Sequence, residues 1–329
     1  MKKKRFLLFI LFITIGISFC FIPSCKKNAI KIPVIFTVNP YNPLIKSTIQ
    51  GKDYTLLVDS GASENLYLDE NVFDQVKKGE LKRTLKIYDL RGNFYNWETY
   101  SISDVKVGPI DLFNYEVVKE SPDFNENTAL WTFIKNPKNR DSHGRIGWQF
   151  FENYCTLFDF PNSSIFIAKK IEELKKEGVL KIENFIPIPF AIQEGALVLS
   201  IQTALGKHQV ILDTGATFCT LRATKVPLNK IKQSPSGKCY FPSSKLIFGD
   251  CDFGDWKFAV TDITELSSVD GVLGTDFFLE HAVYFDFANK IAYIKKPEGS
   301  IATQWRRCKY YLTQFFLRNF SDLPKVENV

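Results

Sequence analysis

The stretches "LLVDSGAS" (residues 56–63) and "VILDTGAT" (residues 210–217) are two versions of one phrase. Each is an apolar run that ends on an aspartate, followed by a small hydroxyl residue, a glycine and an alanine. Such a run predicts a buried strand, and the small residues after it predict a sharp turn. A single Asp-Ser-Gly or Asp-Thr-Gly is a common turn sequence. The repetition is what singles out Asp59 and Asp213.

A second pair of segments repeats after each phrase. "IGWQFFENYCTLFDFPNSSIFI" (146–167) aligns without a gap to "LGTDFFLEHAVYFDFANKIAYI" (273–294). Eight of the 22 positions are identical, including Gly147 and Gly274. Because the two repeats occur in the same order over a long period, we predict a duplicated domain and not a solenoid.

The pattern within each half predicts strands, since short apolar and β-branched runs alternate with Gly, Asn and Asp. The clearest helix signal, "KKIEELKKEGV" (169–179), lies between the halves. We therefore predict an all-β fold of two homologous β-barrel-like lobes with a cleft between them. The predicted divisions are a signal peptide (1–24), a tether (25–32), an N-terminal lobe with the longer flap (33–170), a linker (171–184), a C-terminal lobe (185–297) and a tail (298–329).

Two aspartates at matching turns of a duplicated domain can meet on a pseudo-twofold axis. Carboxylates in contact do not both ionise readily, because each negative charge raises the pKa of the other group. The pair then titrates as a unit that holds one proton. The ionised member can take a proton from water while the protonated member hydrogen-bonds a carbonyl, which suits peptide hydrolysis.

With these motifs the chain resembles the retropepsin-like and pepsin-like aspartic proteases, as two DxGA halves fused in one chain. The resemblance covers residues 30–297 and includes the later phrases "RIG" (145–147) and "VLG" (272–274). It implies a bilobal acid-protease fold and an aspartic-type endopeptidase with Asp59 and Asp213 as the catalytic pair. The supporting residues that it implies are Ser60 and Thr214, which bond across the axis, Gly61 and Gly215, which lie against the carboxylates, Ala62 and Ala216, which end the motifs, and the packing glycines Gly147 and Gly274.

The sequence departs from this pattern at two places. Arg145 stands where the second half has Val272, so the first packing strand is less apolar than expected. The motifs end in Ala62 and Ala216, where pepsins have Ser or Thr. An alanine side chain cannot donate the hydrogen bond that lowers a carboxyl pKa. We therefore expect an activity optimum less acidic than that of a stomach enzyme.

The first half is longer than the second between its aspartate and its packing glycine. Part of the excess lies in "KIYDLRGNFYNWETY" (86–100), which predicts a long hairpin. By the resemblance, this hairpin is a flap over the cleft. Its candidate substrate contacts are Tyr88, Gly92, Tyr95 and Trp97. The alternative is that these aromatic side chains fill the packed face of the hairpin.

The N-terminus "MKKKRFLLFILFITIGISFCFIPSCKKN" has a positive start, an apolar run and Ser24 before Cys25. It resembles a bacterial lipoprotein signal, with cleavage before Cys25 and a lipid on its thiol, although Pro23 departs from the usual pattern. The alternative is an uncleaved signal anchor. Both predict an exported, membrane-tethered protein on the periplasmic or cell-surface side.

The remaining sequence features limit which partners and cofactors we expect. Four cations in the first five residues account for most of the net charge of +6, so no nucleic-acid surface is expected. The three histidines are scattered, so we expect no metal site and no cofactor. Cys239 and Cys251 flank a predicted hairpin and form the one candidate disulfide.

We expect a protein or peptide substrate and a monomer in which the two halves pair within one chain. Two alternatives stay open. The chain could be a non-catalytic peptide-binding or surface interaction lipoprotein on the same scaffold, because a fold does not fix a function. The halves could also pair between two chains.

Overall fold

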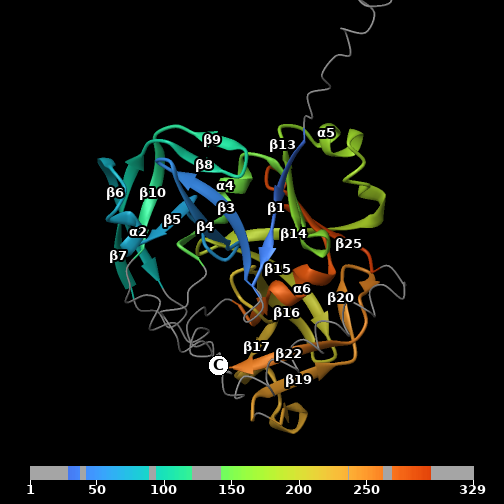
Figure 1. The fold of residues 1–329 in the computed structure, drawn as a ribbon. Helices are drawn as coiled ribbons and strands as arrows, with labels where there is room; N and C mark the ends of the chain where they lie inside the picture. The colour runs from blue at the N-terminus through green and yellow to red at the C-terminus, as the bar shows by residue number, and fades with distance from the viewer. Residues whose placement is uncertain are drawn as a thin grey trace, which may run out of the picture.

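The computed structural model describes residues 29–37, 42–88, 94–120, 142–235, 237–261 and 269–297. Strands dominate these residues, and the helices among them are short. The prediction of an all-β fold is therefore confirmed. Figure 1 shows the blue to teal strands of residues 43–120 grouped apart from the yellow and orange strands of residues 206–261.

Ten strands from the first half of the chain form one sheet. They are β2 (Ile35–Phe36), β3 (Pro43–Ile49), β4 (Lys52–Val58), β5 (Leu66–Asp69), β6 (Lys78–Tyr88), β7 (Phe94–Ile102), β8 (Val105–Val107), β9 (Ile110–Leu112), β10 (Tyr115–Glu120) and β11 (Gly144–Ile146). Their order is β6-β7-β10-β5-β11-β4-β3-β8-β9, with β2 paired to β3.

The second sheet has fifteen strands, and most of them come from the second half. They are β1 (Ile30–Pro33), β12 (Cys155–Asp159), β13 (Ser164–Ala168), β14 (Phe185–Gln193), β15 (Ala196–Thr203), β16 (Gly206–Leu212), β17 (Thr220–Arg222), β18 (Lys232–Gln233), β19 (Cys239–Ser243), β20 (Leu246–Phe248), β21 (Cys251–Asp252), β22 (Trp256–Thr261), β23 (Gly271–Leu273), β24 (Val283–Asp286) and β25 (Ile291–Lys295).

The two halves repeat one strand order. The run β6-β7-β10-β5-β11-β4-β3-β8-β9 in the first sheet corresponds to β18-β19-β22-β17-β23-β16-β15-β20-β21 in the second. In each half a three-residue strand, β11 or β23, runs parallel to the strand before the aspartate and antiparallel to the strand after it. The duplication in the sequence is thus also a duplication in topology.

The halves are joined by the segments that repeat most closely in sequence. Strand β12 pairs antiparallel with β24, and Thr156 lies opposite Phe285. The rings of Phe158 and Phe285 meet edge to face, with centroids 5.3 Å apart, and both side chains are buried. One hydrophobic cluster contains buried residues of both halves. The shared aromatic positions therefore serve to pack one half against the other.

The helices are brief and lie between strands. They are α2 (Glu70–Phe73), α4 (Trp148–Glu152), α5 (Ile171–Lys176) and α6 (Thr275–Glu280), with 3-10 turns η3 (Phe160–Asn162), η4 (Ile182–Asn184), η5 (Ala223–Lys225) and η6 (Leu228–Lys230). Helix α5 lies within the predicted 169–179 segment and buries Leu174. Helices α4 and α6 begin directly after Gly147 and Gly274, at equivalent places.

The start of the body differs from the prediction. Residues 30–32 were assigned to the tether but belong to β1, which pairs with β13. Ile30 and Ile32 alternate with Lys31 and Pro33, and Ile32 is fully buried, so this short period-two pattern is a strand. The signal peptide, Cys25 and the tail 298–329 lie outside the described residues. Of the described residues, none forms a helix long and apolar enough to span a membrane.

The candidate disulfide is wrong. Cys239 and Cys251 are both free thiols in the structure. Cys239 lies in β19, opposite Gln233 of β18, whereas Cys251 lies in β21, opposite Phe248 of β20. The two cysteines thus belong to different hairpins and do not face each other across one, as the spacing had indicated.

The joint between the halves predicts a test of stability. Phe158→Ala removes a buried ring that touches rings from both halves, so we expect the free energy of unfolding to fall by about 3–5 kcal/mol. The matched control is Phe113→Ala, whose ring is 82% exposed, and we expect a change within about 0.5 kcal/mol. Urea denaturation measures both, and equal losses would contradict the packing described.

Candidate active site: the paired aspartate turns

Asp59 is held at the end of a buried strand. Strand β4 buries its last three residues, and Asp59 follows directly. The backbone N–H of Asp59 donates to the carbonyl of Ile146 at 2.9 Å, which extends the parallel β4–β11 pairing into the turn. The N–H of Ala62 returns to the carbonyl of Asp59 at 3.1 Å and closes that turn.

Asp213 is held in the same way in the second half. It follows the buried end of β16, and its N–H donates to the carbonyl of Leu273 at 3.0 Å. The N–H of Ala216 donates to the carbonyl of Asp213 at 3.3 Å. The two turns are therefore copies of one another, each fixed by its own short parallel strand.

The second residue of each motif locks the two turns together. The N–H of Ser60 donates to Thr214 Oγ1, and the N–H of Thr214 donates to Ser60 Oγ, both at 3.0 Å. The hydroxyls then donate to backbone carbonyls of the opposite half, Ser60 Oγ to Leu212 at 3.0 Å and Thr214 Oγ1 to Val58 at 2.6 Å. Both side chains are buried. Four hydrogen bonds thus join residues more than 150 positions apart.

The third position of each motif must be glycine for a steric reason. A Cβ on Gly61 would lie 2.5 Å from Asp213 Cγ, and a Cβ on Gly215 would lie 2.5 Å from Asp59 Oδ1. Each glycine therefore lies against the carboxyl group of the opposite turn, where no larger residue fits. Gly147 and Gly274 lie against their own turns, since a Cβ there would meet the backbone at Ala62 or Ala216.

The two carboxyl groups are brought together over this lock. Asp59 Oδ1 accepts the N–H groups of Gly61 and Ala62 at 3.0 and 3.2 Å. Asp213 Oδ1 accepts those of Gly215 and Ala216 at 2.8 and 3.2 Å. Because Gly61 lies against the carboxyl of Asp213 and Gly215 against that of Asp59, the two carboxyl groups lie next to each other. Asp59 is buried, whereas Asp213 keeps some exposed surface.

This contact has a consequence for protonation. Burial first, and then the negative charge of Asp59, raise the pKa of Asp213 to about 8. The N–H groups of Gly215 and Ala216 act in the opposite direction and are outweighed. Of the two carboxyl groups, Asp213 is therefore the one whose protonated form is favoured near neutral pH.

A charged network that we had not predicted lies beside Asp59. Arg145 Nη1 donates to Asp59 Oδ2 at 3.1 Å, and Arg145 Nη2 donates to Glu120 Oε1. The sequence marked Arg145 only as a departure from an apolar strand, and it gave no sign of Glu120, which lies at the end of β10. The available signal was a cation at a strand position whose repeat counterpart is Val272.

The predicted flap residues have three different outcomes. Gly92 lies outside the described residues, and Tyr88 and Tyr95 lie in β6 and β7 near the hairpin tip. Trp97 is 2% exposed, so it is not a substrate contact, and this prediction is corrected. Strand alternation turns Trp97 inward, where its ring packs on Tyr67 at 5.7 Å and on the Arg145 guanidinium at 5.9 Å.

The hairpins also differ in length, as the sequence indicated. Strands β6 and β7 have eleven and nine residues, whereas β18 and β19 have two and five.

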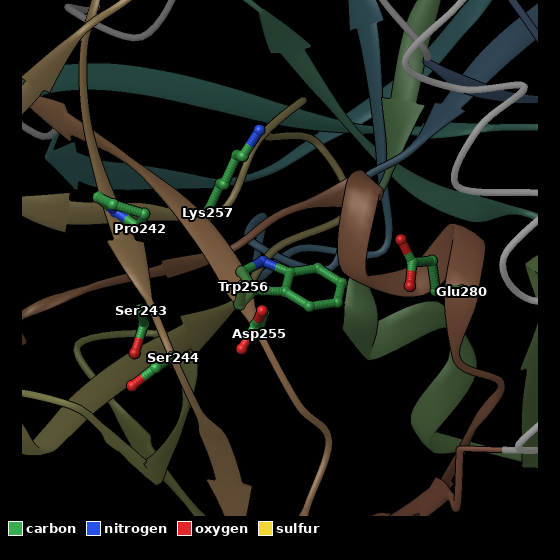
Figure 2. Close-up of a pocket in the computed structure, with 7 residues that line it drawn as sticks. All are labelled: Pro242, Ser243, Ser244, Asp255, Trp256, Lys257 and Glu280. Carbon is green, nitrogen blue, oxygen red and sulfur yellow. The ribbon is translucent and has the colours of Figure 1, made fainter.

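A separate hollow of about 370 Å³ lies in the second half. Figure 2 shows Trp256 at its centre, with Glu280 of α6 on one side and the residues of β19 on the other. None of its lining residues belongs to either aspartate turn. Within the described part of the chain, no group of three or more His, Cys, Asp or Glu side chains is placed to hold a metal ion.

Comparison with known proteins identifies no family. No protein-family model matches the chain, and no curated protein matches it. Among solved structures, the chain is similar to basic 7S globulin from soybean, at 10% sequence identity and a TM-score of 0.53. The match covers 84% of this chain and 98% of that chain. At this identity the likeness extends to the fold alone.

These comparisons do not uphold the resemblance to retropepsin-like and pepsin-like aspartic proteases, and we correct that identification. The similar structure is named as a globulin and not as a protease, and no family model supports the assignment or its lipoprotein-type signal. The likeness supports a β fold of two sheets and does not show the finer bilobal acid-protease fold. Four-residue motifs specify the geometry of a turn and do not define a family.

The crossed bonds predict the effect of a nearly isosteric change. Thr214→Val removes a hydroxyl that donates to Val58 and accepts from Ser60, leaving both of those buried groups unpaired. We expect a loss of about 1–3 kcal/mol in the free energy of unfolding. Thr84→Val, on an exposed position of β6, is the control and should change it by less than about 0.5 kcal/mol. A Thr214 variant as stable as its control would contradict the lock.

The raised pKa of Asp213 predicts how stability depends on pH. The folded protein retains a proton that the unfolded chain releases above its ordinary pKa of 3.8. The contribution of Asp213 to stability is therefore full below about pH 4 and is lost as the pH rises through about 8. Asn cannot titrate, so Asp213→Asn should lose less stability than the wild type over that range.

Urea denaturation at about pH 5 and about pH 8 measures this difference. The comparison must be between the two proteins, because burial also raises the pKa of Asp276, to about 7, and this group adds the same pH dependence to both. Parallel stability curves for the wild type and Asp213→Asn would contradict the raised pKa.

Proposed function

We propose that the chain hydrolyses peptide bonds with a water molecule activated between Asp59 and Asp213. The observation that carries this proposal is the close approach of the two carboxyl groups across the crossed turns. The raised pKa of Asp213 supports it, because it favours one protonated and one ionised member. An acid and a base are then present side by side at the same pH, which is what general acid–base hydrolysis needs.

The proposed reaction uses each carboxyl group in turn. Asp59 takes a proton from water as the water oxygen attacks the carbonyl carbon, and Asp213 gives its proton to the carbonyl oxygen. The tetrahedral intermediate then collapses as the C–N bond breaks. The leaving nitrogen receives the proton held by Asp59, and a hydroxyl of the intermediate returns a proton to Asp213. The pair ends in its starting state, so no cofactor enters the balance.

The proposal also requires that a peptide can reach the paired carboxyl groups. It requires a cleft between two barrel-like halves, with the paired carboxyl groups at its floor. Three features support this arrangement: the matching strand order of the halves, the partly exposed Asp213, and the anchoring of the β6–β7 hairpin beside the pair through Trp97 and Arg145. A hairpin anchored there has the length to fold over a bound peptide.

We also propose a location and an assembly state for the protein. Export and tethering rest on residues 1–28, which lie outside the described part of the structure. A monomer is favoured because the four crossed bonds already pair the two turns within one chain. Substrates would then be proteins or peptides at the same membrane face.

The proposal predicts the outcome of two substitutions. The purified full-length chain should cleave members of a mixed peptide library between about pH 4 and pH 8, the range in which the pair holds one proton. Asp59→Asn and Asp213→Asn should each abolish cleavage, with a loss of at least about a hundredfold, since each removes one of the two proton-transfer groups. Mass spectrometry of the peptide products measures this.

The matched control is Asp286→Asn. Asp286 and Asp159 are also aspartates repeated in both halves, but each bonds a nearby asparagine, Asn289 or Asn162, and neither belongs to an aspartate turn. Its activity should stay within a few-fold of the wild type, as expected of a partly exposed site away from the reaction. A wild type that binds peptides but cleaves none would favour the non-catalytic binding alternative.

A further inference from the structure

Arg145 is the one cation that contacts the paired carboxyl groups within the described residues. Its guanidinium bridges Asp59, at 3.1 Å, and Glu120, and its side chain is 12% exposed. The ring of Tyr67 lies 4.9 Å from the guanidinium carbon and that of Trp97 lies 5.9 Å from it. Two carboxylates and two aromatic rings thus enclose this one charge.

The two aspartates differ in this contact. The repeat counterpart of Arg145 is Val272, which is buried in an apolar cluster with Ile211 and Ala216. Among the described residues, no Lys, Arg or His forms an ion pair with Asp213. Two turns with the same backbone therefore have unlike charge environments, one with a buried cation and one with aliphatic side chains.

Three donors are bound to the carboxylate oxygens of Asp59. Oδ1 accepts two backbone N–H groups, and Oδ2 accepts Arg145. All three donors stabilise a carboxylate and not a neutral carboxyl group. Asp213 has the two backbone donors but lacks the third. Ala62 and Ala216 leave both motifs without a side-chain donor, and Arg145 supplies one to Asp59 alone.

We propose that Arg145 assigns the roles of the two aspartates, by pairing with Asp59 so that Asp59 is the base and Asp213 is the acid. The inference rests on the proposed function for the words base and acid, but the assignment of the proton does not need catalysis. Arg145 acts through Asp59, so it is a positioning residue and not a catalytic one.

Glu120 limits the effect of this cation. With Arg145, Glu120 and Asp59 charged and Asp213 protonated, the buried group carries a single negative charge. Burial lowers the pKa of Arg145, but the charges of Glu120 and Asp59 outweigh it and raise that pKa overall, so Arg145 stays charged. Glu120 and Arg145 have opposite charges, so they act on Asp59 in opposite directions.

Other titratable groups lie near this network, and burial raises the pKa of one of them, Glu64, despite its ion pair with Arg83. Burial raises the pKa of Tyr67 to about 12, so Tyr67 stays neutral. Glu64 and Glu116 each form an ion pair with Arg83, whose side chain is 48% exposed. Neither of these ion pairs involves Asp59. Arg83 is therefore a matched control, an arginine between two carboxylates in the same half of the protein.

The test compares Arg145→Gln, Arg145→Lys, Glu120→Gln and Arg83→Gln. The first readout is the pH dependence of kcat/KM on a cleaved peptide, and the second is ¹³C NMR titration of carboxyl-labelled aspartates, assigned with the Asp59→Asn and Asp213→Asn variants. The NMR readout works whether or not the protein is an enzyme, so failure of the assignment and failure of the proposed function are distinguishable.

We expect opposite shifts from the two partners. Arg145→Gln removes the positive charge, so the acid limb of the profile and the titration of the pair should move up by about 1–3 pH units. Glu120→Gln removes the opposing negative charge, so both should move down. Arg145→Lys keeps the charge and should restore most of the acid limb, and Arg83→Gln should leave it in place.

The result that overturns the proposal is a pair of shifts in the same direction, or no shift at all, from Arg145→Gln and Glu120→Gln. A purely structural role for Arg145 would lower kcat/KM without moving the limbs. If Arg145→Gln does not fold, Glu120→Gln and Arg145→Lys still decide the question, because an unmoved titration in Glu120→Gln contradicts the assignment. Opposite NMR shifts without any peptide cleavage would uphold the assignment and refute the proposed function.

Discussion

The crossed hydrogen bonds between Ser60 and Thr214 are the constraint on which the rest of the site depends. Each residue bonds the backbone of the other turn, so neither turn is complete without its copy. Because the lock is buried and fully paired, it holds the two aspartates at a fixed separation. The close approach then requires glycine at positions 61 and 215, since any side chain there would overlap a carboxyl group. The motif therefore occurs twice because both copies are needed to form this one contact.

Holding two carboxyl groups in one buried place has an electrostatic consequence. Only one of them ionises readily, and the protein determines which one through Arg145 on one side and aliphatic side chains on the other. A symmetric backbone therefore carries an asymmetric charge distribution. Trp97 and Tyr67, which enclose Arg145, belong to the long β6–β7 hairpin and to β5, so the first half supplies both the ionised carboxylate and the structure over it. The second half supplies the protonated partner.

Much of this arrangement follows from the sequence, and the rest depends on contacts that a sequence does not display. The short apolar and β-branched runs predicted the all-β fold, the small residues after Asp59 and Asp213 predicted two tight turns, and the duplication predicted that these turns meet. The four-residue motifs were not enough to identify a protein family, and the comparisons do not uphold the family resemblance. The Cys239–Cys251 disulfide was wrong because spacing does not say which hairpin a cysteine belongs to. For Trp97 the sequence left two positions open, a flap contact or the packed face of the hairpin, because inward and outward strand positions look alike until the register is known, and the structure shows the packed face. The sequence did not indicate a role for Glu120, because its partner, Arg145, lies on a strand 25 residues away.

Neutron diffraction from crystals grown at about pH 6, below the raised pKa of Asp213, tests the central claim most directly, because it locates protons. The account predicts one deuteron in the hydrogen bond between the two carboxyl groups, bonded to Asp213, with Asp59 deprotonated and facing a fully deuterated Arg145. Two deprotonated carboxylates, a deuteron on Asp59, or aspartates too far apart to share a hydrogen bond would contradict it.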